Sequence, residues 1–172
     1  MKFKNKIQKV KAIIFDIDGV MTNGLIGYDS ENEIKFFHVR DGHRMKLAHN
    51  LGLKIGILSG RSAEANRRRA KELEIDFFYE GQKDKREAFQ RLLSEQSLSA
   101  DECAYLGDDI IDIPVLKQCV FSAVTADAPD YLDKFCDFRT KSPGGMGAVC
   151  EFIEVILIGK GLWKKALEKY IK

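Results

Sequence analysis

The sequence contains few cysteines and prolines, and its net charge is small. Of its 172 residues, only four are cysteine and three are proline. The four cysteines form no CxxC pair, so we expect free thiols in a reducing compartment and no cysteine metal site. The formal net charge of +2 is too small to indicate nucleic acid or a membrane as the main partner.

We expect neither a secretory signal nor a membrane anchor in this sequence. Residues 1–6 contain no apolar stretch of the kind that a secretory signal needs. The longest late apolar run, residues 152–158, contains Glu154 and is far too short to cross a bilayer. We therefore expect a cytoplasmic protein.

Apolar runs alternate with amphipathic segments along the chain. Residues 10–17 form a nearly continuous apolar run, which is typical of a strand buried on both faces of a parallel sheet. Further strands are predicted at 54–58, 77–79, 103–106 and 121–124, and helices at 45–51, 63–73, 86–96, 110–118 and 149–158. This alternation predicts an α/β fold, a three-layer Rossmann-like parallel sheet, in one domain over residues 1–172.

Two segments depart from the alternation. Residues 24–38 have apolar side chains on both sides of the polar stretch 29–32, which predicts a β-hairpin after the first strand. We call this segment the flap. Residues 162–172 predict an amphipathic helical tail that packs on the body or on a neighbouring chain.

Polar side chains gather where the predicted strands end. The end of the first strand carries Asp16 and Asp18, which would point the same way if the chain stayed extended. The later strand ends are followed by Ser59-Gly60-Arg61, by Gly81-Gln82-Lys83-Asp84-Lys85 and by Gly107-Asp108-Asp109, with Asp112 one helical turn on. Ligands of open α/β sheets bind at the carboxyl ends of strands, so we expect these side chains to form one site.

This set of side chains suits a phosphoryl group and a metal ion. So many carboxylates in one place repel one another unless a cation lies between them. Oxygen ligands favour Mg²⁺. Ser59 offers a hydroxyl and Lys85 an ammonium, and phosphoryl transfer needs little more than such positioning and charge neutralisation.

The four strand-end segments, in this order, resemble the haloacid dehalogenase superfamily over nearly the whole chain. The resemblance implies that Asp16 is a nucleophile that forms an aspartyl-phosphate and that Asp18 is the general acid–base. It implies that Ser59 binds phosphate and that Lys85 steadies the nucleophile and the phosphate. The implied Mg²⁺ ligands are Asp16, the backbone carbonyl of Asp18, and Asp108, with support from Asp109 and Asp112.

The short spacing between Asp16 and Ser59 leaves no room for the separate cap domain that covers the site in much of the superfamily. In detail, His38-Val39-Arg40-Asp41-Gly42, Ser59-Gly60-Arg61, Gly81-Gln82 and Gly144-Gly145-Met146-Gly147 resemble the capless 3-deoxy-D-manno-octulosonate 8-phosphate (KDO 8-phosphate) phosphatases. These act in lipopolysaccharide precursor synthesis. The resemblance implies a homotetramer and substrate contacts at His38, Val39, Arg40, Asp41, Gly42, Lys46, Gly60, Arg61, Arg69 and Lys85.

Several alternatives remain open from the sequence. Ser59 could be only a helix N-cap, Lys83 could take the place of Lys85, and Asp112 could serve a local structural role. The substrate could be another sugar phosphate, such as the nine-carbon KDN 9-phosphate, although Arg40 and Arg61 favour the eight-carbon one. A phosphomutase, a phosphoacceptor signalling domain and a catalytically inactive scaffold are the other candidate functions.

Overall fold

The centre of the molecule is a six-stranded parallel sheet. A computed structural model describes residues 2–30, 32–168 and 170–171. The strand order is β5-β4-β1-β6-β7-β8, and every neighbouring pair is parallel. The strands are β1 (Ala12–Phe15), β4 (Lys54–Leu58), β5 (Phe77–Tyr79), β6 (Cys103–Gly107), β7 (Phe121–Val124) and β8 (Phe138–Arg139). The predicted α/β fold is confirmed.

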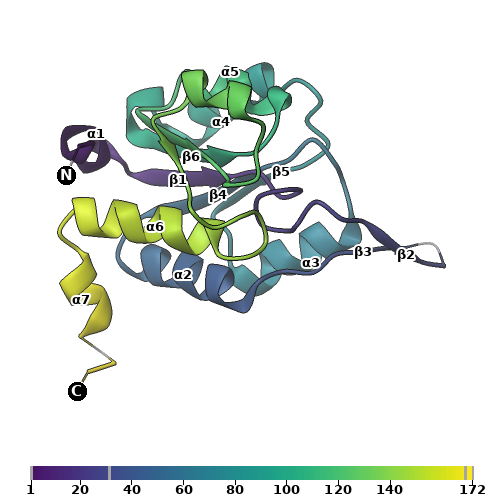
Figure 1. Cartoon of the computed structure of the whole chain (residues 1–172), viewed down its shortest axis with the longest axis horizontal. Helices are drawn as coiled ribbons and strands as arrows, with labels where there is room; N and C mark the ends of the chain where they lie inside the picture. Colours follow the sequence, from purple (N-terminus) through teal and green to yellow (C-terminus); the bar gives the residue numbers. More distant parts are fainter. Residues whose placement is uncertain (1, 31, 169, 172) are drawn as a thin grey trace.

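Helices cover both faces of this sheet (Figure 1). One face carries α2 (Val39–Asn50), α3 (Glu64–Leu73) and α6 (Ala148–Gly159), and the other carries α4 (Lys85–Gln96) and α5 (Ile113–Leu116). The remaining helices are short: α1 (Lys4–Lys9), η1 (Ala100–Glu102), η2 (Ile110–Asp112), η3 (Asp130–Phe135) and α7 (Trp163–Leu167). In the described part of the chain, no helix is long and apolar enough to span a membrane.

The sequence of β1 shows why both faces need a cover. All four of its residues are buried, and successive side chains of a strand point to opposite faces. Ile13 and Phe15 belong to the core under α2 and α6, whereas Ala12 and Ile14 belong to the core under α4 and α5. The continuous apolar run therefore reflects a central strand, because an edge or surface strand would alternate with polar residues.

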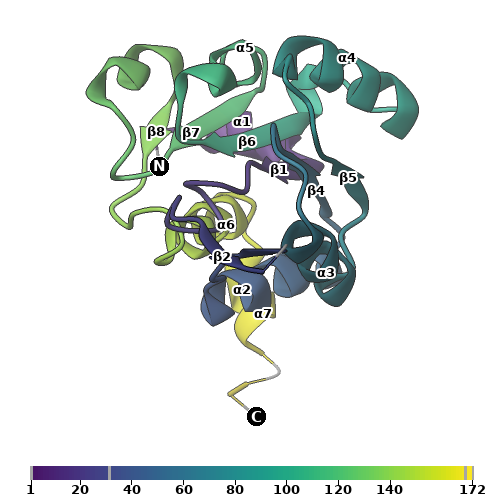
Figure 2. The same cartoon turned by 90° about the vertical axis from the view of Figure 1, so that its right-hand side faces the viewer.

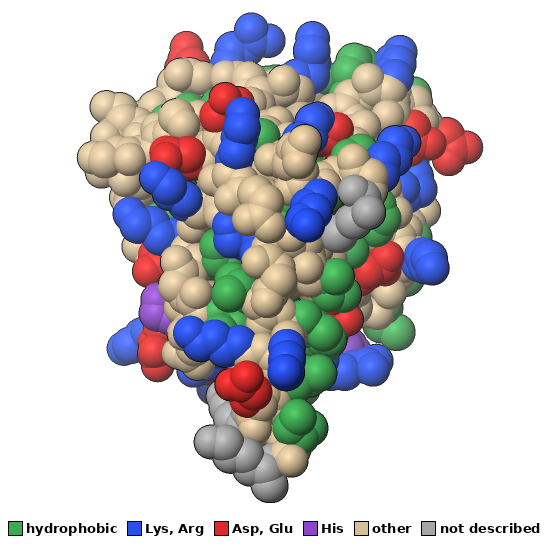
Figure 3. All heavy atoms as spheres, turned by 90° about the vertical axis from the view of Figure 1, so that its left-hand side faces the viewer, with side chains coloured by type: hydrophobic (Ala, Val, Ile, Leu, Met, Phe, Trp, Pro, Cys, Tyr) green, Lys and Arg blue, Asp and Glu red, His purple; other side chains and the backbone are tan. Residues whose placement is uncertain are grey.

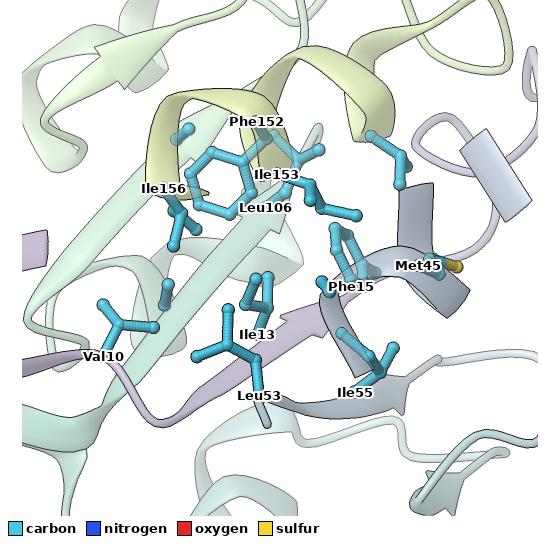
Figure 4. Packing of buried hydrophobic residues seen from close by; sticks show 14 of the residues in the cluster. Val10, Ile13, Phe15, Met45, Leu53, Ile55, Leu106, Phe152, Ile153 and Ile156 are labelled. Carbon is cyan, nitrogen blue, oxygen red and sulfur yellow. The ribbon is translucent and has the colours of Figure 1, made fainter. Parts of the chain in front are cut away.

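Phe152 of α6 lies at the centre of the larger core (Figure 4). Its ring stacks on Phe121 of β7 at a centroid distance of 5.4 Å and meets Phe15 of β1 edge-on at 6.4 Å. Ile153 and Ile156 of the same helix also point into this cluster. These contacts fix α6 against β1, the strand that ends at Asp16.

The flap stands apart from the main sheet. Within the predicted segment, β2 (Gly27–Asp29) and β3 (Asn32–Ile34) form an antiparallel pair, with Gly27 opposite Ile34. The pair forms a sheet of its own and lies beside α3 (Figures 1 and 2). Residue 31, in the predicted turn, lies outside the described residues.

The predicted tail contains α7, and the buried Ala166 joins the core beneath α6. Residues 169 and 172 of the tail lie outside the described residues. The face that looks away from the flap, with the tail at its lower end, carries basic side chains interspersed with acidic ones (Figure 3).

Some element boundaries differ from the prediction. The first strand covers residues 12–15 of the predicted 10–17, because the chain turns directly after Asp16, where the amides of Val20 and Met21 donate to the carbonyl of Ile17. The predicted helix 110–118 is divided into η2 and α5, with Pro114 in the first turn of α5. Neither α1 nor β8 was predicted, since each is too short to show a periodic pattern.

We expect Phe152→Ala to lower the free energy of unfolding by about 3–5 kcal/mol, because it leaves a cavity in a packed aromatic cluster. Urea unfolding followed by circular dichroism would measure the change. Ile158→Ala is the matched control on the same helix, since this side chain is half exposed and its loss should cost less than about 1 kcal/mol. Equal losses for both variants would contradict the assignment of Phe152 to the core.

Candidate active site

The predicted site residues meet where the strand order reverses. From β1 the chain builds outward to β4 and β5, and then returns to β6 on the other side of β1. Such a switch point leaves a crevice at the carboxyl ends of the strands. The cavity there has a volume of about 190 Å³ and is lined by Asp16, Asp18, Ser59, Gly60, Arg61, Asp108, Asp109 and Ile111.

Asp16 follows β1 and is almost fully buried. Its Oδ1 accepts a hydrogen bond from the amide of Ile17 at 2.6 Å, and its Oδ2 lies 2.8 Å from Lys85 Nζ. Burial raises the pKa of Asp16 from 3.8 to about 6, although Lys85 opposes this shift. For Lys85, burial would lower the pKa, but Asp16 and Asp112 outweigh burial and raise it. The Lys85 ammonium is thus held against the carboxylate of Asp16.

Asp112 organises the residues around this pair. Its side chain has no exposed surface. Oδ1 accepts hydrogen bonds from Lys85 Nζ and from Tyr105 Oη, each at 2.6 Å. Oδ2 accepts the amides of Asp108 at 2.8 Å and Asp109 at 3.1 Å. Asp112 therefore joins the lysine to the loop after β6, a larger role than a local cap.

Asp108 carries a buried oxygen with no hydrogen-bond partner among the residues that the structure describes. This atom is Oδ1. Burial, together with the charges of Asp112 and Asp16, raises the pKa of Asp108 from 3.8 to about 8. Gly19 makes the approach of Asp108 possible, because a Cβ on Gly19 would lie 2.0 Å from Asp108 Oδ2 and its φ is +85°.

A divalent cation fits this arrangement. Oxygens of Asp16, Asp108 and Asp112 lie within 4.8 Å of one another. Asp112 already accepts four hydrogen bonds, whereas each oxygen of Asp16 has a single partner and Asp108 Oδ1 accepts no hydrogen bond from the described residues. We therefore regard Asp16 and Asp108 as the better ligands. A cation would offset the burial of Asp108 and its repulsion by Asp112 and Asp16, which together raise its pKa.

Asp18 does not share the direction expected from an extended chain. The chain turns at residues 17–20, and the carboxylate of Asp18 faces the flap. Lys35 Nζ lies 2.6 Å from Asp18 Oδ1 and 2.8 Å from Oδ2. Asp16 and Asp18 nevertheless line the same cavity.

Ser59 and Arg61 lie in the loop after β4. Ser59 is 1% exposed, and its Oγ accepts a hydrogen bond from the amide of Arg61 at 3.3 Å. The interpretation of Ser59 as a helix N-cap is wrong, because the N-cap of α3 is Ala63. The guanidinium of Arg61 pairs with Glu33 of the flap.

The other predicted substrate contacts lie elsewhere on the same chain. A second cavity of about 250 Å³, between α2 and α3, is lined by Val39, Gly42, His43, Lys46, Arg69, Glu72 and Leu73. Arg40 is exposed at the start of α2.

Asp41 is buried and accepts a hydrogen bond from the amide of Cys150 at 2.9 Å, so it ties α2 to α6. Burial raises the pKa of this carboxyl. Nδ1 of His38 lies 3.9 Å from Oδ1 of Asp41.

Comparisons with known proteins identify the family. The model of the haloacid dehalogenase-like hydrolases matches residues 38–119. A 3-deoxy-D-manno-octulosonate 8-phosphate phosphatase from Haemophilus influenzae is 37% identical over 159 residues, which are 92% of this chain and 88% of that one. The chain belongs to the family of 3-deoxy-D-manno-octulosonate 8-phosphate phosphatases. It is accordingly a phosphoric monoester hydrolase, as the strand-end residues predicted.

Solved structures in this family share the whole fold. The Moraxella catarrhalis phosphatase, in complex with a magnesium ion, a phosphate ion and KDO, has a TM-score of 0.94 at 30% identity and 98% coverage of both chains. A cobalt-bound form of the Haemophilus influenzae enzyme has a TM-score of 0.87 at 38% identity, covering 91% of this chain and 92% of that one.

Sequence reasoning missed three residues that the structure brings to the site. Tyr105 lies on β6 and donates to Asp112, but in the sequence it is one apolar residue of a buried strand. Lys35 and Glu33 come from the flap. A signal for these two existed, because Glu33 and Lys35 alternate with Ile34 and Phe36, which places two charges on one face of a strand.

The raised pKa values of Asp16 and Asp108 predict an unusual pH dependence of stability. Between about pH 4 and about pH 8, the folded chain retains protons that the unfolded chain has lost. In EDTA, these two groups should therefore lower the free energy of unfolding as the pH rises through this window. Mg²⁺ should oppose that loss, and increasingly so toward pH 8.

Urea unfolding at several pH values, with EDTA or with Mg²⁺, would measure the effect. Asp108→Asn should reduce both the pH-dependent loss and the stabilisation by Mg²⁺. If Mg²⁺ stabilised the wild type and this variant equally at every pH, the placement of the cation at Asp108 would be wrong.

Proposed function

We propose that this protein is a Mg²⁺-dependent phosphatase that hydrolyses KDO 8-phosphate to KDO and phosphate, in lipopolysaccharide precursor synthesis. The observation that carries the proposal is the Asp16 carboxylate, which pairs with Lys85 and has an oxygen within 4.8 Å of oxygens of Asp108 and Asp112. The named relatives and the Mg²⁺, phosphate and KDO complex of the Moraxella catarrhalis phosphatase support the choice of cation and substrate.

In the first step, Asp16 attacks phosphorus and displaces the sugar alcohol, which forms an aspartyl-phosphate. The hydrogen bond from Ile17 and the ion pair with Lys85 orient the Asp16 carboxylate for this attack. Lys85 and the hydroxyl of Ser59 hold the transferred oxygens, and Asp18 gives a proton to the departing alkoxide. Asp16, Asp108 and the backbone carbonyl of Asp18 would hold the cation, which would neutralise charge between carboxylate and phosphate.

In the second step, Asp18 takes a proton from water, and the hydroxide attacks the aspartyl-phosphate to release phosphate and restore Asp16. Asp112 keeps Lys85 and the loop of Asp108 in place throughout both steps. Asp109 supports that loop, because its Oδ1 accepts the amide of Ile110 at 2.7 Å and its own amide donates to Asp112.

The basic side chains near the site suit a substrate with both a phosphate and a carboxylate. Arg61 lines the cavity of Asp16, and its planar guanidinium can bind a carboxylate with two hydrogen bonds. Arg40, Lys46 and Arg69, together with His38, Val39, Asp41 and Gly42, lie on or beside α2, away from that cavity. We propose that Arg40, Lys46 and Arg69, with His38 and Val39, contact substrate held in the site of a neighbouring copy. The buried Asp41 and Gly42 would hold the start of α2 in place for these contacts.

We expect phosphate release from KDO 8-phosphate to require Mg²⁺ and to exceed that from KDN 9-phosphate. Asp16→Asn should lower turnover by roughly 10⁶-fold, the scale of loss when a covalent nucleophile is removed. A phosphate-release assay, with and without EDTA, measures the Mg²⁺ requirement, the substrate preference and the loss in Asp16→Asn. Retained hydrolysis in Asp16→Asn, or in EDTA, would falsify the mechanism, whereas a preference for KDN 9-phosphate would change only the substrate.

The flap supports the proposal of a homo-oligomer, which we take to be a tetramer. Large apolar side chains of the flap and of the start of α2 are exposed: Leu25 71%, Tyr28 74%, Ile34 40%, Phe36 75% and Val39 81%. A patch of this kind usually marks an interface. A neighbouring copy on this patch would bring its α2 side chains toward the site that the flap adjoins.

Light scattering should therefore give about four times the mass of one chain. Tyr28→Asp with Phe36→Asp should dissociate the assembly and lower phosphatase activity together, because burying a charge in an apolar interface is costly. Glu87→Lys is the control, as an exposed charge change on α4, and should alter neither. Full activity of a monomeric double variant would argue against sites that are shared between copies.

A further inference from the structure

The inner face of the flap carries charges, although its outer face is apolar. Lys35 directly follows β3, and its side chain has no exposed surface. The flanking residues Ile34 and Phe36 are 40% and 75% exposed. Because side chains alternate along an extended chain, Glu33 and Lys35 share the face that Ile34 and Phe36 do not. A hairpin that only shielded apolar surface would have the opposite pattern.

Lys35 and Asp18 form a close, two-point contact. The ammonium lies within 2.8 Å of both carboxylate oxygens of Asp18, and 3.7 Å from Glu33 Oε2. A lysine without exposed surface needs such partners, because an unpaired buried charge is costly. Asp18 itself is 19% exposed in its side chain, so it retains access to the cavity.

A second contact from the same flap face reaches Arg61. Glu33 binds the Arg61 guanidinium, whose Nε lies 3.9 Å from Asp18 Oδ2. Glu33 and Lys35 therefore connect one face of the flap to two residues that line the active-site cavity. The strands of the flap form a sheet separate from the main sheet, whose strand ends carry the site. The ion pairs of Glu33 and Lys35 therefore link the flap to the site.

We propose that Lys35 is a positioning residue for Asp18, and that the flap thereby sets the geometry of proton transfer. This proposal rests on the phosphatase function proposed above. Lys35 contacts both oxygens of Asp18. Because an ammonium has three N–H donors, it can keep its bond to one oxygen and release the other, which is then free to exchange a proton with the substrate. Without Lys35, the Asp18 side chain would rotate among several orientations, of which few reach the leaving oxygen.

The proposal predicts that loss of Lys35 affects two kinds of phosphate ester differently. Cleavage of an alkyl phosphate requires a proton for the alkoxide that leaves, whereas 4-nitrophenyl phosphate releases a stable anion that needs none. We expect Lys35→Met to lower the single-turnover rate of alkyl ester cleavage at least about tenfold, within the roughly 10²–10⁴-fold that a general acid contributes. The single-turnover release of nitrophenolate should change less than about threefold, and KM for the alkyl ester should change little.

Lys35→Met keeps the length of the buried side chain, and Lys35→Ala is the second variant if the first does not fold. Lys71→Ala, an exposed lysine on α3, is the matched control and should leave both rates unchanged. A rise in KM with an unchanged single-turnover rate would overturn the proposal, since Lys35 would then bind substrate directly. Equal losses on both esters would also overturn it, because a purely structural role does not distinguish leaving groups.

A double-mutant cycle provides an independent test. If Lys35 acts through Asp18, Lys35→Met should cost little once Asp18→Asn is in place, and the two losses should not add. Additive losses would contradict the proposal. Because alkyl and aryl esters without the sugar are used, a wrong choice of KDO 8-phosphate as substrate leaves this test intact. An inactive wild type on both esters and on KDO 8-phosphate would instead reject the proposed function.

Discussion

The buried hydrogen bonds of Asp112 hold the site together. One oxygen binds Lys85 and Tyr105, and the other binds the amides of Asp108 and Asp109. The ammonium of Lys85 also pairs with the carboxylate of Asp16. A buried carboxylate is tolerated only when its lone pairs are occupied, and here four donors from three elements occupy them. The ends of β1, β6 and α4 are thus placed relative to one another through a single side chain.

The site also depends on two glycines whose backbone lies close to a buried carboxylate. A Cβ on Gly107 would lie 2.6 Å from Asp112 Cγ, and one on Gly19 would meet Asp108. The two glycines let the acidic loops approach more closely than any other residue would allow. Burial raises the pKa of Asp16 and of Asp108, and the negative charge of Asp112 adds to both shifts, so a cation would relieve the cost of holding these carboxylates together.

The flap connects this centre to the rest of the proposed assembly. Its inner face contacts Asp18 and Arg61, and its outer face is apolar and exposed. A hairpin with two such faces can form an interface with a neighbour and at the same time set side chains in its own active site. The separation of Arg40, Lys46 and Arg69 from the cavity of Asp16 is consistent with the same arrangement.

The sequence alone determined the strands of the parallel sheet other than β8, and the order of the strand-end motifs. Buried parallel strands read as short apolar runs, and the residues that follow them must meet at one edge of the sheet. Asp16, Ser59 and Asp108 could be placed in this way. Tertiary structure decided where each side chain turns. The bend after Asp16 directs Asp18 to Lys35, and a hydrogen bond across 27 positions of sequence joins Lys85 to Asp112. Such pairings depend on packing between distant elements, which no local pattern of residues records.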